Sequence, residues 1–85
     1  MRRLSKRWES LKRATSGIHR AFLPEVNGDG LCWGCIEAKS LDGPFRLEIW
    51  NHTEHEWEFV QTFPTLKEAK EVGRLMAGIA WSQNI

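Results

Sequence analysis

The chain has 85 residues, a net charge of +1, five tryptophans, four phenylalanines and two cysteines. A chain of this size builds one small domain, so we expect residues 1–85 to fold as a single unit. Two cysteines are too few for the disulfide framework of a small secreted domain, and no apolar run is long enough to cross a membrane, so we expect a cytoplasmic protein with no membrane partner.

The near-neutral total hides a separation of charge along the chain. Residues 1–22 carry seven basic side chains against one acidic side chain, a net +6, whereas residues 23–85 carry five against ten, a net −5. Basic segments bind phosphate. Nucleic acid is therefore one candidate partner of the basic set, which consists of Arg2, Arg3, Lys6, Arg7, Lys12, Arg13 and Arg20.

The first predicted element is an N-terminal helix. Apolar residues and one threonine recur at steps of three and four along residues 1–22, at Leu4, Trp8, Leu11, Thr15, Ile18 and Phe22. This spacing is typical of one face of a helix. We therefore expect residues 1–22 to form a basic amphipathic helical arm, with the apolar stripe on the body of the protein and the basic side chains either solvated or bound to phosphate.

Three strands are predicted next, at residues 31–39, 45–50 and 57–63, separated by turns rich in glycine, proline and polar residues. Short connections between successive strands favour an antiparallel sheet over residues 31–63. Regular alternation would place Trp57, Phe59 and Phe63 on one face of this sheet. Arg46, Glu48, Trp50 and Glu58 would then lie on the other face.

The last predicted element is a helix over residues 65–81. Thr65 followed by Glu68 is a capping box, which marks a helix start. Ala69, Gly73 and Ala77 recur at four-residue steps and would let the helix lie close to a sheet. The predicted fold is therefore a two-layer α+β domain, an antiparallel three-stranded sheet with N- and C-terminal helices in the order α-β-β-β-α.

One set of residues has the composition of a metal site. Cys32 and Cys35 form a C-x2-C pair, and His52 and His55 form an H-x2-H pair sixteen residues later. Zinc takes four such ligands in tetrahedral geometry. The histidine spacing is shorter than usual, however, so the sequence leaves two alternatives open: one structural zinc held by these four residues, or no cofactor, with a buried thiol and ordinary turn histidines.

Part of the chain resembles known nucleic-acid-binding folds. Phe63, Thr65, Glu68 and Ala69 match the strand-to-helix pattern F-x-T-x-x-E-A, which resembles that of AP2-type and integrase arm-type DNA-binding domains. The predicted element order, with Lys67-Glu68-Ala69-Lys70 on the last helix, is also similar to double-stranded-RNA-binding domains. These resemblances imply a nucleic-acid partner. Carboxylates on the predicted sheet face and at Glu68 would repel phosphate, which leaves the N-terminal arm as the segment suited to it.

The sequence favours a protein partner over catalysis. No serine or cysteine lies beside a placed base, and no glycine-rich phosphate loop is present, so we expect no enzyme. Tryptophans next to carboxylates suit a basic protein surface. The predicted partner-binding residues are Trp50, Trp57, Glu48, Glu54, Glu56 and Glu58.

Small tryptophan-rich proteins without catalytic residues resemble in type the accessory proteins of phages and mobile elements, among them inhibitors of host defence. This resemblance implies an inhibitor or modulator of a host complex that handles nucleic acid, acting in the host cytoplasm. We expect the protein to be a monomer, or a homodimer formed through the open edge of the sheet.

Overall fold

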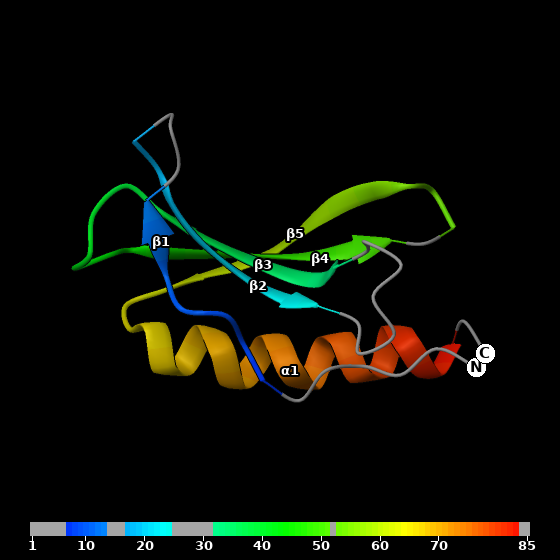
Figure 1. Ribbon diagram of the computed structural model, residues 1–85. Helices are drawn as coiled ribbons and strands as arrows, with labels where there is room; N and C mark the ends of the chain where they lie inside the picture. Colours follow the sequence, from blue (N-terminus) through cyan, green and yellow to red (C-terminus); the bar gives the residue numbers. More distant parts are fainter. Residues whose placement is uncertain (1–6, 14–16, 25–31, 52, 84–85) are drawn as a thin grey trace.

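The computed structural model describes residues 7–13, 17–24, 32–51 and 53–83, with side chains described as far as residue 77. These residues form five strands and one helix (Figure 1). The elements are β1 (Lys12–Arg13), β2 (His19–Pro24), β3 (Cys32–Ala38), β4 (Phe45–Asn51), β5 (Glu56–Phe63) and α1 (Leu66–Gln83).

The α+β class, the antiparallel sheet and the C-terminal helix are confirmed, but the strand number is wrong. The described strands form one antiparallel sheet in the order β1-β2-β3-β4-β5, so β1 and β5 are its two edges. Helix α1 lies against one face of this sheet, and no described helix covers the other face (Figure 1). The molecule therefore has two layers, as predicted.

The predicted N-terminal helix is also wrong, because the described part of residues 7–24 is extended and forms β1 and β2. Ala21 and Leu23 are fully buried two residues apart, as in a strand. Gly17, at φ +84°, lies between the two strands in the left-handed region that a turn requires and a helix does not use. Since β2 pairs along β3, it also shields an edge that a three-stranded sheet would expose.

The indole of Trp8 belongs to the core and is only 7% exposed. Its Nε1 donates a hydrogen bond of 2.9 Å to the carbonyl oxygen of Lys70 on α1. A Cβ atom built on Gly73 would lie 2.5 Å from this ring, and one built on Gly34 would lie 2.9 Å from it. Trp8 therefore fills the space between helix and sheet that these two glycines leave open.

Helix α1 begins as the capping box predicts. The hydroxyl oxygen of Thr65 accepts a hydrogen bond of 3.2 Å from the backbone N–H of Glu68, which satisfies a donor at the helix start. Ala69 and Ala77 are fully buried and Gly73 is buried between them. The prediction that small residues bring the helix close to the sheet is confirmed.

Candidate functional site

The surface of the sheet that faces away from α1 is called here the open face. Phe45, Leu47 and Ile49 of β4 are buried on the helix side, so Arg46, Glu48 and Trp50 lie on the open face. Cross-strand partners share a face. The open face therefore also carries the residues of β3 and β5 that pair with Arg46, Glu48 and Trp50, which are Cys35, Glu37, Trp57, Phe59 and Thr62. The residues of β2 that pair with Cys35 and Glu37 lie on it too, and these are Phe22 and Arg20.

Strand β5 is irregular at Val60, and this changes which side chains reach the open face. Leu47 pairs with Gln61 but the next residue, Glu48, pairs with Phe59, so Val60 is an extra residue in β5. Phe63 therefore lies on the helix side, where it is buried, whereas Trp57 and Phe59 lie on the open face. The prediction that all three share one face is wrong.

The same irregularity moves Glu58 off the open face. Glu58 pairs with Ile49, and Glu56 pairs with Asn51, so both carboxylates lie on the helix side of the β4–β5 hairpin. The predicted face with Glu48, Trp50 and Glu58 together is therefore wrong, because Trp57 takes the place beside Trp50 and Glu58 lies on the other side of the hairpin. Glu48 alone of the predicted glutamates shares the open face with Trp50 and Trp57.

Ion pairs occupy the centre of the open face. Arg20 lies 3.6 Å from Glu37, and Arg46 lies 3.5 Å from Glu48. The guanidinium of Arg46 also stacks on the ring of Phe59, 4.2 Å from its centroid. The positive and negative groups thus neutralise one another, and the centre of the open face is not the acidic surface that we predicted.

Burial shifts the pKa of two groups in this centre. The Glu48 side chain is only 17% exposed, and burial, followed by the nearby charge of Glu37, raises the pKa of its carboxyl group. Burial also raises the pKa of Cys35 to about 12, with the carboxylates of Glu37 and Glu48 adding to the shift. These groups are therefore poor candidates for a contact that needs a free anion.

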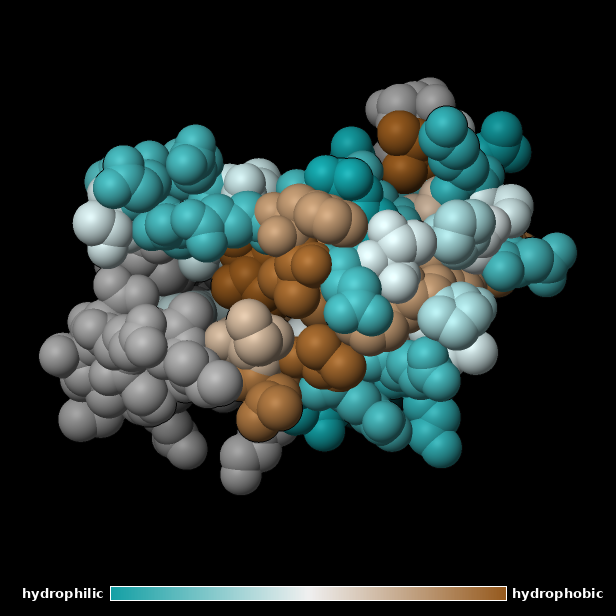
Figure 2. All heavy atoms as spheres, turned by 180° about the vertical axis from the view of Figure 1, so that it is seen from behind, coloured by the Kyte–Doolittle hydropathy of each residue, from teal (hydrophilic) through white to brown (hydrophobic). Residues whose placement is uncertain are grey.

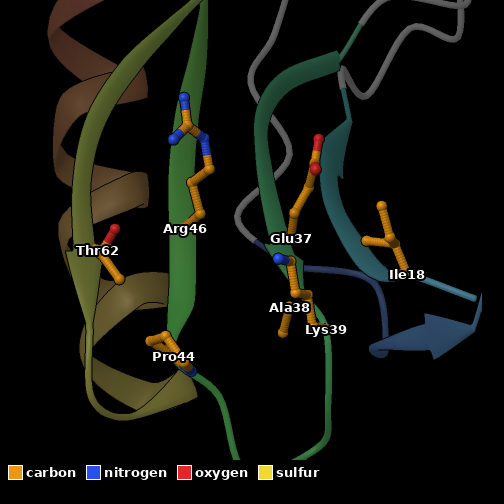
Figure 3. A pocket seen from close by; sticks show the side chains of 7 residues that line it. All are labelled: Ile18, Glu37, Ala38, Lys39, Pro44, Arg46 and Thr62. Atoms are coloured by element: carbon orange, nitrogen blue, oxygen red, sulfur yellow. The ribbon is translucent and has the colours of Figure 1, made fainter.

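A shallow hollow of about 360 Å³ opens beside this network, near the β3–β4 turn (Figure 3). It is lined by Ile18, Glu37, Ala38, Lys39, Pro44, Arg46 and Thr62. The carboxylate of Glu37 and the guanidinium of Arg46, which Figure 3 shows rising from neighbouring strands, are the two charges held in ion pairs with Arg20 and Glu48. Two of the three charged side chains that line the hollow are thus engaged within the sheet, whereas the third, Lys39, is exposed.

The β4–β5 hairpin carries the exposed carboxylates. Glu54, Glu56 and Glu58 are all exposed. The side-chain oxygen of Asn51 accepts hydrogen bonds from the backbone N–H groups of Thr53 and Glu54, at 2.9 and 3.0 Å, and its amide nitrogen donates one of 2.6 Å to Glu58. These bonds fix the turn and engage the carboxylate of Glu58.

Exposed aromatic rings lie on the other side of the same hairpin. Phe59 is 51% exposed and Trp57 is 37% exposed. Trp57 packs edge-on against half-buried Trp50, with ring centroids 5.3 Å apart and planes at 69°. Sequence reasoning missed Phe59, because regular alternation places it in the core and nothing in the pattern marks the extra residue at Val60.

Large apolar side chains are exposed on both layers of the molecule. Of the five large apolar side chains that are exposed among the described residues, Trp57 and Phe59 belong to β5 and Leu75 and Met76 to α1. Figure 2 shows apolar side chains gathered in the middle of the face seen from behind, with hydrophilic side chains on both sides of them. A patch of this kind, flanked by charge, is typical of a protein-binding surface.

The predicted zinc ligands are only partly described, since His52 lies outside the described residues. Among the described residues, no group of three or more His, Cys, Asp or Glu side chains is placed to hold a metal. Cys35 lies within the sheet opposite Glu48, whereas His55 is exposed in the turn beyond β4. The described residues thus fit zinc poorly, and the four-ligand site stays a prediction.

The predicted basic arm is also only partly described. Arg2, Arg3 and Lys6 lie outside the described residues, and Arg7 is exposed. Lys12 and Arg13 form β1 and are exposed, opposite Arg20 and His19 of β2. The two edges of the sheet therefore differ in charge, with basic side chains along β1 and carboxylates along β5.

Comparison with known proteins adds no assignment, because no family model, no curated protein and no solved structure matches this chain. The resemblances to AP2-type, integrase arm-type and double-stranded-RNA-binding domains stay predictions. Within the described residues, no helix combines the length and the apolar character needed to cross a membrane.

Proposed function

We propose that this protein is a non-enzymatic protein-binding module that contacts a basic protein surface through its β4–β5 hairpin. The observation that carries the proposal is the arrangement of Trp57 and Phe59, exposed on one side of the hairpin, with Glu56 and Glu58 exposed on the other. Exposed aromatic rings are the usual anchors of protein interfaces, and the surrounding carboxylates select a cationic partner.

Basic protein surfaces commonly hold nucleic acid. A small acidic hairpin that occupies such a surface excludes the nucleic acid by steric and electrostatic competition. We therefore propose an inhibitor or modulator of a host complex that handles nucleic acid, in the manner of phage and mobile-element accessory proteins. Glu48 is not part of the proposed contact surface, because it is half-buried in an ion pair with Arg46.

The test is capture of a partner from host-type lysate on the tagged protein, with and without nuclease, followed by affinity measurements with the purified partner. Trp57→Ala is expected to weaken the complex about 30-fold, the effect of losing an interface anchor worth about 2 kcal/mol. Leu41→Ala is the matched control, since Leu41 is an exposed apolar residue on the β3–β4 turn. A complex that survives nuclease but tolerates Trp57→Ala and Phe59→Ala as well as it tolerates Leu41→Ala would refute the proposed surface.

The second candidate function is nucleic-acid binding through the basic residues. Lys12 pairs with Arg20 across β1 and β2, and like charges directly opposite one another destabilise a sheet. Phosphate bound along this edge would relieve the repulsion. Binding of a short duplex should then weaken steeply with salt and fall on Lys12→Ala and Arg13→Ala. Recovery of a protein partner only without nuclease would favour this alternative.

A further inference from the structure

The outer edge of β5 is a second feature of the hairpin. β5 is eight residues long, from Glu56 to Phe63, and stands at the end of the strand order. It pairs with β4 on one side, and no other described strand pairs with it. An edge strand presents backbone N–H and C=O groups outward, and an extended segment can add to it as a further strand.

Both sides of this edge favour cations. On the open face, Trp57 and Phe59 are exposed, and the guanidinium of Arg46 already stacks on the Phe59 ring at 4.2 Å. On the helix side, the side chains of Glu56 and Glu58 are exposed. Residues of an added strand alternate between these two sides, within reach of their cross-strand neighbours. A cation thus finds an aromatic ring on one side and a carboxylate on the other.

We propose that the edge of β5 binds an extended segment rich in arginine and lysine from a partner protein, by adding it to the sheet as a sixth strand. Backbone hydrogen bonds to β5 supply register, stacking on Trp57 and Phe59 holds the cations of one side, and ion pairs with Glu56 and Glu58 hold those of the other. The inference rests on the proposed function and names the class of segment that the hairpin binds.

The charges of the two edges favour this occupant over a second copy of the chain. Two β5 edges side by side would bring carboxylates of one copy next to those of the other, which is unfavourable. The basic edge β1 has the complementary sign, but it is only two residues long, from Lys12 to Arg13. It would add few backbone hydrogen bonds, so a longer basic segment fits the edge better.

The probe is a capped octapeptide with the order Arg-Arg-Thr-Thr-Arg-Arg-Thr-Thr, which places arginines on both sides of an added strand. Its first control is the same peptide methylated on its four central backbone nitrogens, which keeps the charge but cannot pair along either edge. Its second control replaces each arginine with glutamate. We expect the unmethylated arginine peptide to bind at least about tenfold more tightly than both controls. We also expect it to slow hydrogen exchange of alternate β5 amides by at least about tenfold, because strand addition covers outward-pointing N–H groups.

Variants of the protein test the charge match. The double variant Glu56→Lys, Glu58→Lys should bind the arginine peptide at least about tenfold more weakly than the parent protein. Circular dichroism should confirm that the double variant is folded. Glu71→Lys is the matched control, as Glu71 is exposed on α1, and it should leave the affinity unchanged.

Equal binding of the methylated and unmethylated peptides, with unchanged exchange in β5, would overturn strand addition. The proposed function survives that result if Trp57→Ala still weakens binding of the captured partner. If Trp57→Ala does not weaken that binding, the proposed function is refuted as well. Concentration-dependent self-association that is abolished by Lys12→Glu and Arg13→Glu, without peptide binding, would make a second copy the occupant and would also overturn the inference.

Discussion

Replacing Gly73 with alanine tests the position of Trp8 between the helix and the sheet. In an exposed helix interior, glycine to alanine stabilises by about 1 kcal/mol. Here the new methyl carbon would lie 2.5 Å and 3.1 Å from two atoms of the Trp8 ring and 2.9 Å from a methyl group of Leu47. Forcing a methyl group into a filled core costs about 1–3 kcal/mol.

Because the ring is rigid and two of the contacts are shorter than 3.0 Å, we expect the cost to lie near the upper end of that range. Gly73→Ala should then lower the free energy of unfolding by about 1–2 kcal/mol, once the helix contribution is subtracted. The assay is urea denaturation followed by far-ultraviolet circular dichroism. A variant as stable as the parent protein, or more stable, would refute the placement of the ring.

The control is a double-mutant cycle with Trp8→Leu, which removes the ring that the methyl group meets. In that background Gly73→Ala should be neutral or stabilising, giving a coupling energy of about 2 kcal/mol between the two positions. Gly34→Ala should be milder than Gly73→Ala, since only one contact of its Cβ, at 2.9 Å from the Trp8 ring, is shorter than 3.0 Å. Additive effects of Trp8→Leu and Gly73→Ala would contradict the contact.

Three further predictions concern ionisation and the helix start. With a pKa of about 12, about one Cys35 thiol in 10⁴ is ionised at pH 8, and only the thiolate reacts with an alkylating reagent. Mass spectrometry should therefore show alkylation of Cys35 in urea and none in the folded protein. Rapid modification without urea would contradict its burial. Glu48 has a raised pKa in the folded state, so its ionisation opposes folding as pH rises above the ordinary carboxyl range near 4.5. Glu48→Gln should therefore gain stability relative to the parent protein between pH 4 and pH 7, and an equal difference at both values would show that Glu37 and burial do not act on this group. Thr65→Ala should lower the free energy of unfolding by about 1 kcal/mol, because the N–H of Glu68 loses its acceptor, whereas Thr65→Ser should leave it nearly unchanged.

The sequence predicted the C-terminal half of the fold well because local signals there agree with one another. A capping box starts α1, turn residues separate the strands, and each of the predicted segments 31–39, 45–50 and 57–63 contains most of a real strand. The N-terminal prediction failed because residues 1–22 also satisfy a helical spacing. What decides between helix and strand there is pairing of β2 with β3, a non-local contact that periodicity does not contain.

The candidate site was predicted in composition but not in arrangement. Trp57, Glu54, Glu56 and Glu58 do lie together on one hairpin, and all four are exposed. Alternation puts Trp57 on the side opposite Glu56 and Glu58 in any strand. Which of these sides is the open face follows from the extra residue at Val60, which no residue type announces, since valine is favoured in regular strands. The ion pair between Arg20 and Glu37 likewise depends on which strands are neighbours, so the sequence suggested an acidic face where the structure has a neutral one.

Deleting Val60 tests this irregularity in β5. In a regular strand, removing one residue turns every following side chain to the opposite face and destroys the packing. Here Leu47 already pairs with Gln61 and Glu48 with Phe59, so the deletion should leave both pairs and both faces in place. The expected cost is at most about 2 kcal/mol, the contribution of a partly buried valine side chain.

The free energy of unfolding is measured by urea denaturation, and the contact between the rings of Trp50 and Trp57 is measured by proton NMR. The ring contact should persist in the deletion variant, because the two residues remain cross-strand partners. Deletion of Arg46 from the regular part of β4 is the control and should abolish cooperative unfolding, since β4 is paired on both sides. If deleting Val60 is as damaging as deleting Arg46, then β5 is regular and Trp57 and Phe59 belong to the helix side. The proposed contact surface on the open face would then lose its aromatic residues, because one residue decides whether these rings meet the core or a partner.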